Sequence, residues 1–248
     1  MDSDVLALCD GICGELVAAG AEAVVLTGSQ ARGTATSESD IDLVVIGDGP
    51  AYDLDVRAGR LVSLSWRAAG RQREQFRLPQ AAGKEVPAWR SAVIVADRTG
   101  VAGELQELAR AFAWADIAAP AREWVAAELA GYAEEVHKLV AALRHERPRV
   151  AAVQRNLLAT HLAPVLAVHF RILSDSENDI WDQVAARAGE PWRSAQDRAL
   201  ALDGQPLAVS CRAALDLYAA AVAAAGDMFT ERQRRVVAEA VSLAGQDG

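Results

Sequence analysis

Residues 21–48 constrain the fold of this chain more than any other part of its sequence. Two short apolar runs, residues 24–26 and 43–46, stand on either side of a polar segment that is rich in turn-forming residues. Short apolar runs bounded by such residues are typical of buried β-strands. We therefore expect two neighbouring strands joined by a polar connection, and the residues of that connection predict chemistry.

The end of this connection carries two acidic residues, Asp40 and Asp42. Side chains alternate sides along a strand, so these two carboxylates should point the same way, with Cα atoms about 6.5 Å apart. Two carboxylates at that separation can share one Mg²⁺, which takes few protein ligands and completes its shell with water and phosphate oxygens. The spacing predicts a metal site at Asp40 and Asp42.

The start of the connection has residues suited to a phosphate. Gly28 allows a sharp turn and a close approach of the backbone to a ligand. Ser29 offers a hydroxyl and a backbone N–H where a short helix can begin. Arg32 can add a charge-assisted hydrogen bond to the same phosphate. We therefore predict a phosphate site beside the carboxylate pair.

Composition limits the class of protein. The chain has 248 residues, 52% of them hydrophobic, and a net charge of −9. This composition predicts a soluble globular protein, and the acidic balance argues against broad contact with nucleic acid. It favours a cationic small substrate. No uncharged apolar run of about 18 residues occurs, so we expect no transmembrane helix, and the acidic N-terminus and three cysteines favour a cytoplasmic protein with free thiols.

The pattern of residues changes near position 100. Before it we predict a helix at 4–19, strands at 24–26, 43–46, 60–67 and 91–96, and a short helix at 71–80 that stops near Pro79. After it we predict only helices, at 101–115, 120–146, 149–174, 178–188, 206–225 and 229–244. The fold class is α+β, with a mixed-sheet domain at 1–115 and a helical-bundle, substrate-binding domain at 116–248.

The motif Gly28-Ser29-x-Ala31-Arg32-Gly33, followed by Ser39-Asp40-x-Asp42, resembles the signature of the DNA polymerase β-like nucleotidyltransferase superfamily. The resemblance implies that Asp40 and Asp42 hold Mg²⁺ and act in catalysis. It also implies that a nucleoside triphosphate, ATP first among them, is bound by Gly28, Ser29, Arg32 and Ser39.

One feature departs from that signature. The superfamily usually has a third acidic residue on a neighbouring strand, and here the matching strand, residues 61–66, has Ser63 or Ser65 at the expected position. Three interpretations remain open. A carboxylate from elsewhere, such as Asp53 or Asp55, completes the site; or the enzyme works with fewer ligands; or catalysis has been lost and the protein only binds a nucleotide.

The order of the two domains is similar to that of the kanamycin nucleotidyltransferase family. By this resemblance Glu134 would be the catalytic base toward the acceptor hydroxyl, and Lys138, one helical turn later, would contact the nucleotide phosphates. The alignment leaves Glu135 and Glu128 as alternatives for the base. The resemblance also implies a homodimer with shared sites.

The function we expect is Mg²⁺-dependent transfer of a nucleoside monophosphate, AMP first among them, from an NTP to a hydroxyl group. The expected acceptor is a small, hydroxylated, cationic molecule such as an aminoglycoside-like antibiotic. Two alternatives are a nucleotidyltransferase of a toxin–antitoxin pair that modifies a protein or tRNA, and a non-catalytic nucleotide-binding protein of the same fold.

Overall fold

The computed structural model describes residues 3–246, which form two compact units. The first unit comprises Met1–Asp116 with Leu173–Glu177, and the second comprises Ile117–Ile172 with Asn178–Gly248. The elements of the first unit are α1 (Ser3–Ala18), β1 (Ala23–Thr27), α2 (Gly28–Arg32), β2 (Ile41–Ile46), β3 (Asp53–Arg57), β4 (Arg60–Arg67), α3 (Ala69–Gln75), α4 (Pro79–Ser91), β5 (Val93–Asp97) and α5 (Val101–Ala111).

Within the described residues, the first unit is built on a five-stranded sheet in the order β3-β4-β2-β1-β5. β2 and β4 are parallel, and the other neighbouring pairs are antiparallel. The parallel pair arises because the chain leaves β2, forms the edge strand β3, and turns back to place β4 beside β2. This mixed sheet, followed by a helical second unit, confirms the predicted fold class.

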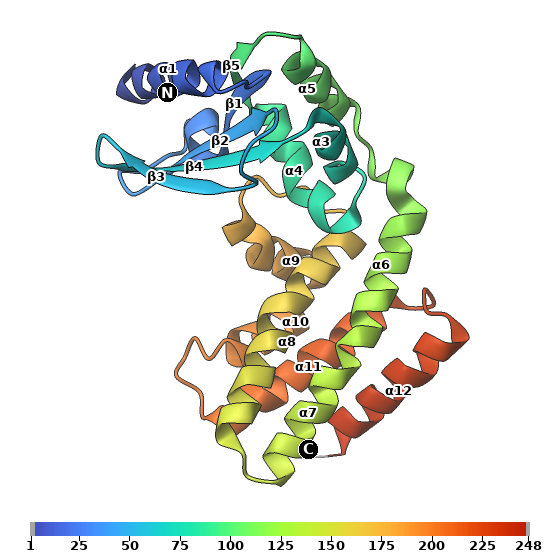
Figure 1. Cartoon of the computed structure of the whole chain (residues 1–248). Helices are drawn as coiled ribbons and strands as arrows, with labels where there is room; N and C mark the ends of the chain where they lie inside the picture. The colour runs from blue at the N-terminus through green and yellow to red at the C-terminus, as the bar shows by residue number, and fades with distance from the viewer. Residues whose placement is uncertain (1–2, 247–248) are drawn as a thin grey trace. The chain divides into compact units, whose positions relative to one another are not determined.

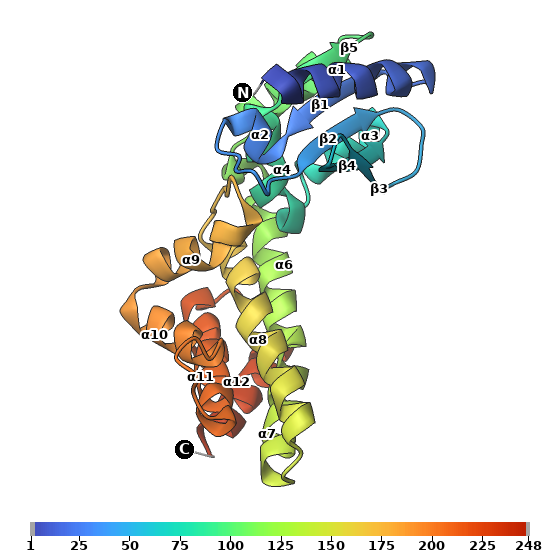
Figure 2. The same ribbon diagram turned by 90° about the vertical axis from the view of Figure 1, so that its left-hand side faces the viewer.

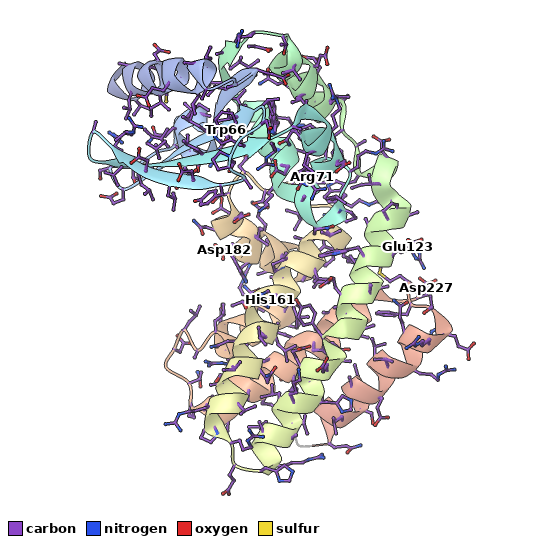
Figure 3. All side chains as sticks on the ribbon, in the orientation of Figure 1. Trp66, Arg71, Glu123, His161, Asp182 and Asp227 are labelled. Carbon is purple, nitrogen blue, oxygen red and sulfur yellow. The ribbon has the colours of Figure 1, made fainter. Side chains whose placement is uncertain are left out.

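The helix α1 covers one side of this sheet (Figure 1). The apolar residues of α1 pack on strand residues that alternate along β1, β2 and β4. These residues are Val24, Leu26, Ile41, Leu43, Val45, Val62 and Trp66. Trp66, labelled in Figure 3, also lies against the turn after β2, where a Cβ on Gly49 would come within 2.4 Å of the indole ring. The opposite side of the sheet is therefore the side that carries Asp42.

The edge strand β3 was not predicted from the sequence, which left residues 53–57 as a loop. It forms a hairpin with β4 through Ala58 and Gly59, which both have positive φ (51° and 76°). Two successive residues of this kind are typical of the type I′ turn that suits a two-residue hairpin. The sequence of β3 did not predict a strand because its polarity is reversed. Its charged residues face α1, where Arg57 pairs with Glu15, and its apolar residues face solvent.

The sequence predicted a single short helix at 71–80, whereas the structure has α3 there and a further helix, α4, which was missed. Pro79 begins α4 rather than ending the preceding helix. A second proline, Pro87, lies inside α4 and has no N–H to donate to the carbonyl oxygen of Gly83. Ser174 takes that place: its backbone N–H donates to the Gly83 carbonyl at 2.8 Å. This bond joins the segment Leu173–Glu177 to α4 within the first unit.

The second unit consists, in its described regular elements, of helices. They are α6 (Ala118–Gly131), α7 (Ala133–Arg144), α8 (Pro148–His169), α9 (Ile180–Ala188), α10 (Glu190–Ala199), α11 (Leu207–Ala225) and α12 (Glu231–Gly245). The helix expected at 120–146 is divided at Tyr132, and α10 was missed because Pro191 looked like a breaker although it lies in the first turn of a helix.

The helix α11 lies at the centre of the second unit, where it packs on α8, α10 and α12. By length and composition alone it could cross a membrane. Arg212 and Asp216 interrupt its apolar sequence and pair with each other at 3.2 Å. Helix packing inside the unit accounts for its many small apolar residues, of which Ala213, Ala214 and Ala221 are buried.

Tyr218 of α11 makes a hydrogen bond to the end of α6, next to the break between α6 and α7. Its hydroxyl is buried and donates to the carbonyl oxygen of Leu129 at 3.0 Å. That carbonyl lies in the last turn of α6, where such groups have no partner inside their own helix. Burial raises the pKa of Tyr218 far above its usual value, so the hydroxyl keeps the proton that it donates.

Tyr218→Phe should therefore lower the free energy of unfolding of the second unit by about 1–3 kcal/mol, because the Leu129 carbonyl remains buried without a partner. Urea unfolding followed by hydrogen exchange at α11 amides measures the change. Tyr52→Phe, at a side chain that is mostly exposed, is the matched control and should leave stability unchanged. Equal stability of Tyr218→Phe and wild type would contradict this role of the hydroxyl.

Candidate active site

The candidate site is built around Asp42, the second residue of β2. Its cross-strand partners are Thr27 at the end of β1 and Ser63 in β4. Residues directly opposite in a sheet point to the same side, so the three side chains form a row across neighbouring strands. The Ser63 hydroxyl donates to Oδ1 of Asp42 at 2.7 Å, and the Thr27 hydroxyl donates to the Asp42 carbonyl oxygen at 3.4 Å.

Gly28 closes the other side of the Asp42 carboxylate. A Cβ added at this position would lie 2.3 Å from Oδ2 of Asp42 and 3.2 Å from its Cγ. Gly28 also has a φ of +68°, in the left-handed region that side chains disfavour. Two independent reasons therefore require glycine here: the backbone turn itself and the space that the carboxylate occupies.

Gly28 begins the short helix α2, which Figure 2 shows at the end of β1. Gly33 ends the helix in the left-handed conformation, with its N–H bonded to the Gln30 carbonyl, and Thr34 returns a bond to the Ser29 carbonyl. A short helix at this point was predicted from the sequence, and within it Ser29 is half-buried beside Gly28. Gln30 is buried, and its Nε2 has no hydrogen-bond partner among the described residues.

Arg32 lies close enough to Asp42 for its positive charge to act on the carboxylate. Asp40, immediately before β2, acts on the same carboxylate with a negative charge. The structure thus brings Gly28, Arg32, Asp40 and Asp42 together from both ends of the connection between β1 and β2.

Ser39 has a structural role in this connection. Its hydroxyl oxygen accepts the backbone N–H of Thr36 at 2.9 Å, and its own N–H donates to the Thr36 carbonyl at 3.2 Å. These bonds close a turn directly before Asp40. Ser39 therefore presents Asp40 to the site, and its role toward a nucleotide stays a prediction.

The Asp42 carboxyl has a pKa above its ordinary value. Burial is the main cause, because it removes water from the charged form, and the negative charge of Asp40 adds to the effect. The hydrogen bond from Ser63 and the charge of Arg32 oppose the shift. A buried carboxylate with a second acid beside it gains from a bound cation, and this donor set fits Mg²⁺.

Ser63 occupies the position where the third carboxylate was sought, because Ser63, and not Ser65, is the register partner of Asp42. Asp53 and Asp55 do not replace it. They pair with Leu64 and Val62, which lie on the α1 side of the sheet, and Asp55 is engaged by Arg57. The described residues hold no cluster of three or more His, Cys, Asp or Glu side chains suited to a metal.

The direct bond between Ser63 and Asp42 was not anticipated. Pairing the two predicted strands 43–46 and 60–67 in parallel register would have found it, but the sequence contains no signal for that register.

Glu134 and Lys138 lie in the second unit, on consecutive turns of α7, and they pair with each other at 2.7 Å. The hydrogen bond from Lys138 lowers the pKa of Glu134, which makes this carboxylate a weaker base than a free glutamate. Glu135 lies 3.6 Å from the same lysine and is more buried. The pKa of the Tyr132 hydroxyl is raised, mainly by burial. The negative charges of Glu135 and of the alternative base Glu128 raise it further.

Comparison with protein families finds a similarity over the segment that carries the site. Residues 11–86, from α1 to α4, match the family model described as the nucleotidyltransferase domain. This match contains Gly28, Ser29, Arg32, Asp40 and Asp42. No protein of curated function matches the sequence.

Among solved structures, the chain is similar to a nucleotidyltransferase-like protein from Exiguobacterium sibiricum 255-15. The TM-score is 0.56 with 16% sequence identity, and the alignment covers 90% of this chain and 78% of that one. At this identity the likeness is one of fold, and it includes helical as well as sheet elements.

Proposed function

We propose that this protein is a divalent-metal-dependent nucleotidyltransferase that moves a nucleoside monophosphate from an NTP, ATP first among them, to a hydroxyl of a small molecule. The observation that carries the proposal is the close packing of Gly28 on the Asp42 carboxylate, with Asp40 and Arg32 beside it, inside the segment that matches the nucleotidyltransferase domain. The kanamycin family serves as a model for the acceptor class and for the catalytic base.

The reaction forms one bond and breaks another at the α-phosphorus. The acceptor oxygen attacks phosphorus, the bond from phosphorus to the bridging oxygen of the β-phosphate breaks, and pyrophosphate leaves with that electron pair. In this proposal Ser29 and the backbone at Gly28 bind the β- and γ-phosphates, and Arg32 balances part of their charge. Glu134, by the family resemblance, takes the proton of the acceptor hydroxyl.

Asp40 and Asp42 are the residues that would hold the metal. A bound Mg²⁺ supplies positive charge against the triphosphate oxygens and stabilises the leaving pyrophosphate. The two carboxylates form an incomplete ligand shell, which suits an ion whose remaining ligands are phosphate oxygens and water. Ser63, hydrogen-bonded to Oδ1, orients the Asp42 carboxylate so that Oδ2 lies toward Gly28.

The test is pyrophosphate release in the presence of Mg²⁺, each of the four NTPs and a panel of hydroxylated acceptors, including aminoglycosides. Wild-type protein should turn over with at least one combination. The double variant Asp40→Asn with Asp42→Asn should lose at least about 10³-fold in rate, since it removes both charges from the site. Asp53→Asn, on the other side of the sheet, is the control and should keep full activity. Unchanged turnover in the double variant would refute the assignment.

A second candidate is a protein that binds NTP without transferring it. The serine at position 63 favours it, because a hydroxyl neither carries the negative charge of a third carboxylate nor acts as a base near neutral pH. This candidate predicts NTP binding by calorimetry, dependent on Asp42, with no pyrophosphate released from any acceptor in the panel.

A further inference from the structure

The row of side chains that contains Asp42 continues beyond Ser63 to the edge of the sheet. Leu54 in β3 is the cross-strand partner of Ser63, so the row runs Thr27, Asp42, Ser63, Leu54. Val56 and Leu61, which oppose each other in the β3–β4 hairpin, lie on the same side of the sheet. By continuation of the β2–β4 register, Asp40 comes level with Leu61.

This side of the hairpin is apolar and open. Leu54 is 50% exposed, Val56 is 64% exposed and Leu61 is 46% exposed. We call these three residues the apolar hairpin face. The other side of the same hairpin is charged and occupied, with Asp55, Arg57 and Glu15 of α1 in contact. An edge strand thus keeps its apolar residues uncovered on the side that carries the candidate site, which is the reverse of the usual arrangement.

The geometry of the proposed reaction indicates that the acceptor approaches over the apolar hairpin face. In-line displacement requires the acceptor oxygen to approach phosphorus from the side opposite to the leaving pyrophosphate. If the β- and γ-phosphates lie at Gly28 and Ser29, at the end of β1, and the α-phosphate lies at Asp42 in β2, then the acceptor enters from the β4 and β3 side. Neighbouring strands lie about 4.8 Å apart, so Leu54, two strands beyond Asp42, is about 10 Å away. A molecule of the size of one or two sugar rings spans that distance.

We propose that the apolar hairpin face binds the acceptor, and that the acceptor is a small hydroxylated molecule with an apolar portion next to the reacting hydroxyl. This inference rests on the proposed function and specifies the acceptor more narrowly, since net charge alone predicted only a cation. Leu54 and Val56 contact the apolar portion, and the hydroxyl lies over β4, near Ser63.

The open edge of β3 argues against a protein strand as the occupant. The backbone N–H groups of Leu54 and Val56 donate to the carboxylates of Asp53 and Asp55, at 2.9 and 2.7 Å. An added strand would need free N–H groups at this edge, and these two are taken. The available surface is therefore the face of the hairpin rather than its edge.

Methyl NMR tests the inference with a pair of probes. Protein labelled at Leu, Val and Ile methyls is saturated with Mg²⁺ and the non-hydrolysable analogue α,β-methylene-ATP. It is then titrated with phenyl β-D-glucopyranoside or with methyl β-D-glucopyranoside, which share their hydroxyls and differ in the apolar group. We expect the phenyl compound to shift the methyl signals of Leu54, Val56 and Leu61, and the methyl compound to leave them unchanged.

The variant Leu54→Thr with Val56→Thr keeps strand-forming residues and removes apolar surface. It should weaken binding of the phenyl compound about tenfold, while the nucleotide analogue still shifts the Gly28 and Ser29 amides. Ile94→Thr, at an exposed residue of β5 on the far edge, is the matched control and should bind the phenyl compound as wild type does.

The outcomes separate this inference from the proposed function. If the analogue shifts Gly28 and Ser29 but neither glucoside shifts the apolar hairpin face, or both do so equally, the acceptor inference is wrong and the proposed function stands. If the analogue does not shift Gly28 and Ser29, both are wrong. If the three methyl signals move on dilution without any probe, a second copy of the chain covers the face, and the inference is likewise overturned.

Discussion

Gly28→Ala should abolish nucleotide-dependent pyrophosphate release and also lower the stability of the first unit by about 2–5 kcal/mol. Two costs add. The new Cβ lies 2.3 Å from Oδ2 of Asp42, and overpacking of this kind costs about 1–3 kcal/mol. The φ of +68° costs a non-glycine residue about 1–2 kcal/mol more. Relief of the clash must turn the Asp42 carboxylate away, which disrupts the proposed metal site.

Gly33→Ala is the matched control for the backbone cost. Gly33 has nearly the same φ, +72°, but a Cβ there meets nothing within 4 Å. We expect this variant to lose only about 1–2 kcal/mol. The difference between the two variants therefore measures the contact with Asp42. Native-state hydrogen exchange at the β1 amides reports the stability of the first unit without interference from the second.

A double variant tests the same contact in another way. Asp42→Ala removes the atoms that the new methyl group meets, so Gly28→Ala combined with Asp42→Ala should recover about 1–3 kcal/mol of stability while remaining inactive. Simple addition of the two single effects would show that Gly28 and Asp42 do not interact and would contradict the packing described above.

Asp42→Asn should abolish the stabilisation that Mg²⁺ and a nucleotide analogue give to wild-type protein. A ligand at one hundred times its Kd adds about 2.7 kcal/mol to the free energy of unfolding when it binds only the folded state. The variant lacks one of the two charges proposed to hold the metal, so its Tm should change little on addition of Mg²⁺ and α,β-methylene-ATP. Asp53→Asn is the control and should respond as wild type does.

Without metal, Asp42→Asn should instead raise the free energy of unfolding above that of the wild-type protein. Because the pKa of Asp42 is raised in the folded protein, folding favours the protonated carboxyl. Its contribution to stability is complete below the unfolded pKa, about 3.9, and is lost as the pH rises through the higher folded pKa. The amide of the substituted side chain carries no charge at any pH and can still accept the Ser63 hydroxyl. We therefore expect Asp42→Asn to exceed wild type in Tm at pH 7 without metal.

The expected pH profile gives this prediction a second measurement. The stability advantage of Asp42→Asn should shrink as the pH falls below the folded pKa of Asp42, where the wild-type carboxyl is also neutral. A variant that is less stable than wild type at pH 7 without metal, or an advantage that is independent of pH, would contradict the raised pKa.

Several features of the first unit follow from local sequence. The strands at 24–26 and 43–46 are apolar runs between turn residues, and the stripe of α1 recurs at helical spacing, so both were predicted near their observed positions. The site residues Gly28, Arg32, Asp40 and Asp42 are also local, because one short connection carries all of them. Their proximity requires only that its two flanking strands pair.

Other features were missed because their causes are distant in sequence. Pro87 is tolerated inside α4 because Ser174 bonds the carbonyl that proline leaves free, and Leu129 at the end of α6 is bonded by Tyr218, 89 residues later. β3 has charged and apolar residues on the sides opposite to expectation, since α1 supplies Glu15 for Arg57. In each case the observed structure differs from the one that the local pattern predicts, because a partner distant in sequence supplies the stabilising contact.

By itself, then, the amino-acid sequence determined the fold class and predicted which residues form the candidate site, because strand periodicity and the glycine and aspartate spacings are properties of short segments. Only the tertiary structure decided that Ser63 bonds Asp42, that Asp53 and Asp55 face away, and that an apolar hairpin face continues the row of Asp42. The physical reason is strand register. Which side chains stand together across a sheet depends on the alignment of strands, and a shift of one residue in that alignment would turn every one of them to the other side.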